Sequence, residues 1–116
     1  PTYAPDIAEW TKAFLPGGVA SEEGGIFHLG NSGACSWLEW GEACLAAALD
    51  RGVDLRAREI RGSKLDEVAA FVAERPRMSA LNCGKLESIT GIHPRAWEEA
   101  VQAHFSVLYG DEPVSS

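Results

Sequence analysis

Apolar residues recur at helical spacing in two stretches of the first half of the chain. The stretch over 5–15 begins with a proline, which suits the first turn of a helix, and a Pro-Gly-Gly sequence stops it. The stretch over 36–50 begins with Ser36 and Glu39 at the spacing of a capping box, and Gly52 follows as a typical end signal. We predict an amphipathic helix in each stretch.

Three more helices are predicted in the second half. One covers 63–75, with Ser63 as its predicted cap. It must end before Pro76, because the residue that precedes a proline avoids the helical region. Asn82 is positioned to cap a short helix that ends at Gly91. Pro94 opens the last helix, which carries its apolar residues on one face.

Short apolar or alternating runs predict strands over 26–29, 53–57 and 78–81. The predicted fold class is therefore α/β, mostly helical with a few short strands. Two or three short strands cannot cover several amphipathic helices. The predicted sheet is thus incomplete, which indicates a partner domain.

The length and composition predict one domain. The chain has 116 residues, of which 46% are apolar, and it contains four Trp and four Phe. These supply one core, so we expect a single domain over 1–109 and a mobile tail over 110–116. The chain opens at Pro1 without an initiator Met, which indicates a fragment of a longer protein.

The charge and the cysteines exclude several classes of partner. A net charge of −7 disfavours nucleic acid, because phosphate backbones are bound by basic surfaces. No apolar run reaches the roughly 20 residues of a membrane span, and no signal peptide is visible. Three cysteines are an odd number, which predicts free thiols and a cytoplasmic location. The histidines and cysteines fit no zinc spacing, so no metal site is predicted.

Positive charge is concentrated in the segment 51–77. This segment holds seven of the ten Lys and Arg residues and has a local charge of +2. It is either a solvated surface or a receptor for a small anion such as a diphosphate, which the arginine fork suits. Arg75 and Arg77 flank Pro76 in an irregular segment, where side chains can converge on a ligand.

The Gly-Asn-Ser-Gly loop over 30–33 lies between a predicted strand and a predicted helix. It is either a tight turn or a phosphate cradle at a helix N-terminus. The dinucleotide fingerprint G-x-G-x-x-G and the P-loop signature are both absent from the sequence. No cofactor is therefore placed in this chain.

Three stretches of the chain carry motifs in a characteristic order and spacing. The first is PTYAPDIA over 1–8, and the second is GIFHL with SGACSW within 25–37. The third is RPRMSALN with KL, GI and W within 75–97. Together they resemble dTDP-4-dehydrorhamnose reductase, an extended short-chain dehydrogenase/reductase. The resemblance covers residue 1 to about residue 108, and the segment 53–74 matches least.

The resemblance implies the C-terminal, substrate-binding portion of such a reductase, with the Rossmann domain absent from this chain. In that family the Rossmann domain carries the NADPH (or NADH) and a Tyr-x-x-x-Lys catalytic pair. Neither Tyr3 nor Tyr109 is followed four residues later by Lys. We therefore expect no catalytic and no cofactor-binding residue here, and a chain that reduces nothing alone.

The same resemblance implies the substrate contacts. Thr2 and Tyr3 would lie near the sugar or the interdomain cleft, and Arg75, Arg77 and Ser79 would approach the nucleotide diphosphate. The expected partners are a dTDP-sugar and the Rossmann domain of the same protein, and a homodimer is left open. Trp37 and Trp97 are expected in the core rather than as stacking platforms.

The leading function is therefore substrate binding for the reduction of dTDP-4-dehydro-L-rhamnose to dTDP-L-rhamnose. Two alternatives stay open. One is a non-catalytic interaction or regulatory module that keeps the fold, because fold alone does not fix function. The other is a reductase or epimerase that acts on a different nucleotide sugar.

Overall fold

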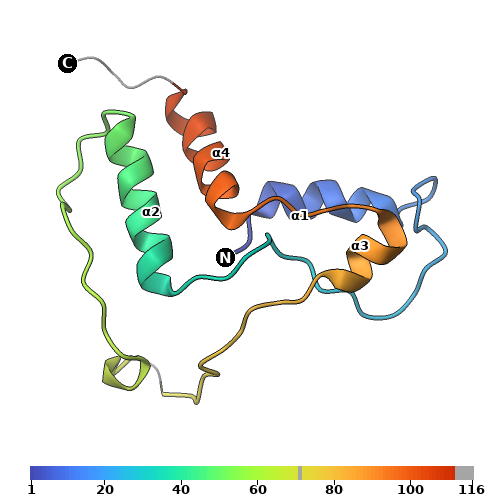
Figure 1. The fold of residues 1–116 in the computed structure, drawn as a ribbon, viewed down its shortest axis with the longest axis horizontal. Coiled ribbons are helices and arrows are strands. Elements are labelled where there is room, and N and C mark those ends of the chain that lie inside the picture. The colour runs from blue at the N-terminus through green and yellow to red at the C-terminus, as the bar shows by residue number, and fades with distance from the viewer. Residues whose placement is uncertain (71, 112–116) are drawn as a thin grey trace.

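Helices form the regular structure of residues 1–70 and 72–111, which are the residues that the computed structural model describes. In chain order the elements are α1 (Ala4–Thr11), η1 (Lys12–Phe14), α2 (Trp37–Asp50), η2 (Leu65–Glu67), α3 (Gly84–Thr90) and α4 (Trp97–Tyr109), where η denotes a 3₁₀ helix. Figure 1 shows α2 and α4 packed side by side, with α1 and α3 at the other end of the molecule.

Both helices predicted in the first half are present. α1 has Pro5 in its first turn and continues into η1. α2 has the predicted capping box, because Ser36 Oγ accepts from the Glu39 amide at 3.0 Å and Glu39 Oε1 accepts from the Ser36 amide at 3.1 Å. Gly52 follows α2 with a φ of 74°, in the left-handed region that glycine adopts at low cost.

The prediction of a helix over 63–75 is wrong for the described residues of that stretch, which exclude Phe71. Only η2 forms there. Val72 is 97% exposed, and Leu65 is also exposed, so the apolar positions of this stretch find no surface to cover. An isolated helix of this length is marginal in water, because helical stability comes mostly from packing.

The predicted short helix near Asn82 is confirmed as α3. Asn82 Oδ1 accepts from the Gly84 amide at 2.8 Å, and Gly91 ends the helix with a φ of 74°. Leu86 on this helix is completely buried. The N-cap residue itself is Cys83, which makes no side-chain capping bond, so the predicted cap at Asn82 lies one residue too early, whereas the predicted end at Gly91 is confirmed.

The last helix begins at Trp97, three residues later than predicted from Pro94. The intervening backbone pairs with Ser32 instead. The Ser32 amide donates to the Arg95 carbonyl at 3.0 Å, and the Trp97 amide donates to the Ser32 carbonyl at 3.0 Å. These bonds hold the residues before Trp97 in an extended conformation.

The three predicted strands are not formed. In the described part of the chain the β-type pairing is one isolated parallel bridge, between Ser32 and Ala96. The segments 26–29, 53–57 and 78–81 have no ladder partner, and a strand needs a neighbour to satisfy its backbone. The helical part of the α/β prediction is confirmed, and its strands are a correction.

A small hydrophobic core cluster lies between α2 and α4, apart from the buried Trp10 on α1 and Leu86 on α3. Ala47, Trp97 and Val101 form its centre. Partly buried side chains surround them: Cys35, Trp40, Ala43, Cys44 and Phe105. Trp97 is 7% exposed, which confirms its predicted core position, whereas Trp37 is 84% exposed, so the core prediction for it is wrong.

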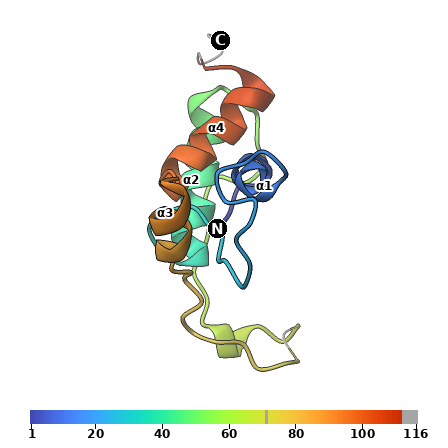
Figure 2. The ribbon, with the colours of Figure 1, turned by 90° about the vertical axis from the view of Figure 1, so that its right-hand side faces the viewer.

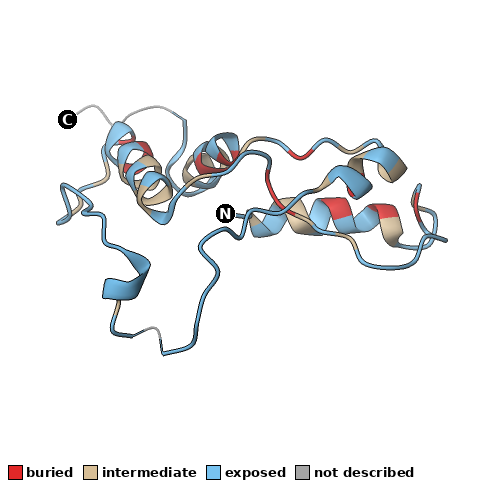
Figure 3. Cartoon of the chain, turned by 60° about the horizontal axis from the view of Figure 1, so that its bottom comes forward, coloured by how far each residue is buried: buried red, intermediate tan, exposed pale blue. Residues whose placement is uncertain are grey.

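The chain is flat and open. Its extents are 50 × 41 × 19 Å, and its radius of gyration is 17.3 Å, against about 13 Å for a compact domain of this length. It exposes 8634 Å², roughly 2,500 Å² more than a compact protein of its mass. Figures 2 and 3 show the cause, a long and almost wholly exposed loop that leaves α2 and returns to α3.

Two further predictions concern the membrane and the tail. Among the described residues, no helix is long and apolar enough to cross a membrane. Residues 112–116 of the predicted mobile tail lie outside the described residues, so that prediction stays a prediction.

Candidate functional site

A polar cluster holds the N-terminal segment against the 30–33 loop. The Tyr3 amide donates to Asn31 Oδ1 at 2.8 Å. Asn31 Nδ2 in turn donates to Asp6 Oδ2 at 2.8 Å and to the Arg95 carbonyl at 3.3 Å. Asn31 is buried, so these partners satisfy an amide that has left water.

Asp6 and Arg95 complete this cluster with a two-pronged ion pair. Arg95 Nε donates to Asp6 Oδ2 at 2.9 Å, and Arg95 Nη2 donates to Asp6 Oδ1 at 2.8 Å. The Asp6 side chain is 13% exposed and that of Arg95 is 40% exposed. We call Tyr3, Asp6, Asn31 and Arg95 the clamp, because they join three distant parts of the chain.

The clamp changes the pKa of its charged members. Burial acts to raise the pKa of Asp6, but the hydrogen bonds from Arg95 and Asn31 and the positive charge of Arg95 outweigh it. The net result is that the pKa of Asp6 is lowered. The hydrogen bond to Asp6 raises the pKa of Arg95 despite partial burial. Both groups are therefore held in their charged forms.

Of the predicted site residues, Tyr3 belongs to the clamp and Thr2 directly precedes it in the chain. The Tyr3 ring packs edge-on to His104 at a centroid distance of 5.7 Å, and the Arg95 guanidinium lies 5.7 Å from the same ring. Thr2 is exposed, and its hydroxyl lies close to Gly30, because a Cβ added to this glycine would be 3.5 Å from the hydroxyl oxygen. The structure therefore places both residues at the same loop.

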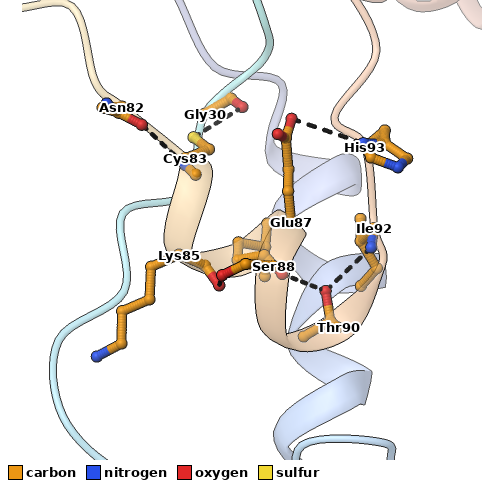
Figure 4. Close-up of polar contacts among 11 residues, drawn as sticks. Gly30, Asn82, Cys83, Lys85, Glu87, Ser88, Thr90, Ile92 and His93 are labelled. Carbon is orange, nitrogen blue, oxygen red and sulfur yellow. Dashed lines mark hydrogen bonds and ion pairs between the residues drawn. The ribbon is translucent and has the colours of Figure 1, made fainter.

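That loop forms one wall of an open cavity of about 480 Å³. Residues 30–34 line one side, 80–84 line the other, and Glu87 and Pro94 contribute the rest. The Cys83 thiol donates to the Gly30 carbonyl at 3.5 Å and ties the two walls together (Figure 4). The predicted site residue Ser79 immediately precedes the second wall.

The structure does not bring every predicted residue to this cavity. Arg75, Arg77 and Ser79 are exposed, and none of the three is among its lining residues. They lie on the returning arm of the long loop, between η2 and α3 (Figure 1). The assignment of Arg75 and Arg77 to a diphosphate stays a prediction.

Arg51, at the start of the basic segment, has a structural role instead. It is buried, and its guanidinium donates to the carbonyls of Ala47, Gln102 and Gly110 and to Gln102 Oε1. It therefore ties the end of α2 to α4. A side chain so engaged has little capacity to bind a ligand.

The 30–33 loop does not fit a phosphate or a dinucleotide. The side-chain amide of Asn31 is already hydrogen-bonded to Tyr3, Asp6 and Arg95 within the clamp. A Cβ on Gly33 would lie 3.2 Å from Trp97, so this glycine allows close packing of the protein on itself. The first turn of α2 is already capped by Ser36 and carries the acidic Glu39, which disfavours an anion there. The loop forms neither a tight turn nor a phosphate cradle: Ser32 pairs with Ala96 in a parallel bridge, and the chain bends at Gly33.

Two of the three thiols lie in partly buried surroundings. Burial raises the pKa of Cys35 and of Cys44, which keeps both thiols protonated near neutral pH. Among the described residues, no three or more His, Cys, Asp or Glu side chains gather in a group that could hold a metal ion.

Three residues of the clamp escaped the sequence analysis. Asp6 stands inside the PTYAPDIA stretch and Asn31 inside the Gly-Asn-Ser-Gly loop, but neither was singled out. Arg95 directly follows Pro94 and lies 89 positions from Asp6. No periodicity or spacing connects residues so far apart. The one signal of the clamp in the sequence is Asn31, a polar residue inside a glycine-rich loop.

The described residues form a helical domain with an open cavity between residues 30–34 and 80–84. The family model of the RmlD substrate binding domain matches residues 1–109, and the chain belongs to this family. The resemblance found in the sequence is thereby confirmed.

Among curated proteins, the chain is similar to the spore coat polysaccharide biosynthesis protein SpsK of Bacillus subtilis (strain 168). The two are 34% identical over 105 residues. The alignment covers 90% of this chain and 32% of SpsK, so the chain spans about a third of that relative. No solved structure matches the chain significantly.

Proposed function

We propose that the chain is the substrate-binding domain of a dTDP-4-dehydrorhamnose reductase. The complete enzyme would reduce dTDP-4-dehydro-L-rhamnose to dTDP-L-rhamnose, and this domain would hold the nucleotide sugar without being catalytic alone. The observation that carries the proposal is the match of residues 1–109 to the RmlD substrate binding domain. The similarity to SpsK, whose name refers to polysaccharide biosynthesis, supports a role in nucleotide-sugar metabolism.

The partner in this proposal is a Rossmann domain of the same protein, located in the cytoplasm. It would carry the NADPH (or NADH) and the catalytic tyrosine and lysine. The excess exposed area and the segments 26–29, 53–57 and 78–81, which have no ladder partner among the described residues, support a partner that covers them. Ile26 is an example, because this large apolar side chain is exposed in a stretch of strand-forming residues.

The substrate contacts in this proposal follow the sequence assignment. Thr2 and Tyr3 would face the sugar or the interdomain cleft, and the clamp supports this by fixing their backbone. Arg75, Arg77 and Ser79 would meet the diphosphate. Arginine suits this role because its planar fork matches the phosphate oxygens with two parallel hydrogen bonds.

A different nucleotide sugar is the second candidate substrate. The printed name of SpsK refers to the spore coat polysaccharide and not to rhamnose. A titration series with several nucleotide sugars distinguishes the two, since the preferred sugar binds most tightly.

Isothermal titration calorimetry with dTDP-L-rhamnose tests the proposal. The chain is expected to bind this ligand weakly, because ligands between domains need both halves for full affinity. Arg75→Ala should weaken binding about tenfold, the loss of a hydrogen bond to a charged group. Arg61→Ala is the matched control, since Arg61 is exposed and pairs with Glu59. Unchanged affinity in Arg75→Ala rules out the arginine assignment, and no binding by the unmodified chain contradicts the proposal.

A further inference from the structure

The cavity between residues 30–34 and 80–84 has a chemistry different from that of the basic segment. Among the described residues that line it, Glu87 is the charged one, and no Lys or Arg contributes. A carboxylate accepts hydrogen bonds and repels phosphate. The cavity therefore does not suit the diphosphate of a nucleotide sugar.

The residues that line the cavity suit a neutral, ring-shaped ligand with one apolar edge and another edge that carries hydroxyl groups. Leu81, Pro94 and Ala34 offer apolar surface, and Glu87 offers acceptor oxygens. The volume of about 480 Å³ lies within the range of about 300–1,000 Å³ that is usual for small-molecule sites. A 6-deoxyhexose combines a methyl group with several hydroxyl donors, so it matches both kinds of lining.

The Glu87 carboxylate is available for such a ligand. The His93 ring lies near it, with Nδ1 at 3.8 Å from Glu87 Oε1, too far for a hydrogen bond. The side chain is 40% exposed and extends from α3 toward the side on which Gly30 and His93 lie (Figure 4). A carboxylate has about four lone-pair sites, so several hydroxyl groups could donate to it.

We propose that this cavity binds the hexose of the nucleotide sugar and that Glu87 accepts hydrogen bonds from its hydroxyl groups; this inference rests on the proposed function. The path of the chain agrees with a hexose site in this cavity. The diphosphate of a nucleotide sugar is bonded to the anomeric carbon, so it would lie at the rim of the cavity. Arg77 is three residues from Ala80, which an extended chain spans in about 10 Å.

Calorimetric titrations with dTDP-L-rhamnose and with dTDP alone test this inference. The unmodified chain should bind dTDP-L-rhamnose more tightly than dTDP. Glu87→Gln should weaken dTDP-L-rhamnose binding about tenfold, because a charged acceptor is lost, and should leave dTDP binding unchanged. Glu42→Gln is the matched control, since Glu42 is an exposed helical glutamate outside the cavity and should change neither affinity.

A second measurement does not depend on any variant. Amide resonances of residues 30–34 and 80–84 should shift in NMR spectra when dTDP-L-rhamnose is added, and should shift much less with dTDP. Binding of dTDP-L-rhamnose with unchanged affinity in Glu87→Gln, or shifts confined to other residues, overturns the hexose site while the proposed function stands. No binding of either ligand by the unmodified chain overturns the proposed function itself.

Discussion

Replacing Asp6 by alanine removes the carboxylate that ties the N-terminal segment to the residues before α4. Asp6 accepts three hydrogen bonds, two from Arg95 at 2.8 and 2.9 Å and one from Asn31 at 2.8 Å. In this variant the side-chain amide of Asn31 loses its hydrogen bond to the carboxylate, and the Arg95 guanidinium loses its negatively charged partner. We expect the free energy of unfolding to fall.

The size of this loss follows from burial. Hydrogen bonds to charged groups contribute about 1.5–3 kcal/mol each when well formed. Arg95 is 40% exposed, so water replaces part of what the variant removes, and salt screens the pair. We therefore expect a loss of about 2 kcal/mol for the whole Asp6 carboxylate, well below the sum of three separate bonds.

Urea unfolding followed by far-ultraviolet circular dichroism measures this loss at neutral pH. Glu9→Ala is the matched control, because Glu9 also lies on α1 but pairs with Lys12 on the exposed surface at 2.8 Å. Such an exposed pair contributes about 0–1 kcal/mol. A loss in Asp6→Ala no larger than that in Glu9→Ala would refute the stabilising role of the clamp.

The pH dependence gives a second reading of the same prediction. The folded pKa of Asp6 is lowered, so its stabilising effect is fully present above the unfolded value near 3.8 and is lost as pH falls through the lower folded pKa. The stability difference between the unmodified chain and Asp6→Asn should therefore shrink below about pH 4. A constant difference over this range contradicts the assigned cause of the pKa shift.

Five other variants probe the packing by the same urea assay. Ser36→Ala should cost about 1 kcal/mol through loss of the α2 cap, whereas Ser63→Ala, at a predicted cap whose helix does not form, should cost almost nothing. Trp97→Ala should cost about 3–5 kcal/mol and Trp37→Ala less than about 1 kcal/mol, and a reversed order would contradict the position of the core. Arg51→Ala should cost about 3 kcal/mol through its lost bonds to α4 and Gly110, and an unchanged midpoint would contradict them.

The helices could be predicted where their signals are local. The capping box of Ser36 and Glu39 and the left-handed Gly91 act within one turn, so the sequence contains the whole interaction. The start of α4 could not be predicted from Pro94, because the pairing of Ser32 with the residues around Ala96 decides it. That pairing joins residues more than sixty positions apart.

The strands illustrate the limit of a local pattern. Residues 26–29 alternate between exposed and half-buried positions, as a strand does, but a ladder needs a second strand that the described residues do not supply. The clamp is unpredictable for the same reason, since Asp6, Asn31 and Arg95 share no spacing. Likewise, the side-chain type alone could not separate the exposed Trp37 from the buried Trp97.

We propose that this chain binds the nucleotide sugar and not the cofactor. Parallel titrations of the chain with dTDP-L-rhamnose and with NADPH, followed by calorimetry, test it most directly. Saturable binding of dTDP-L-rhamnose with no detectable binding of NADPH is the predicted result. Binding of NADPH without binding of the nucleotide sugar would contradict the claim.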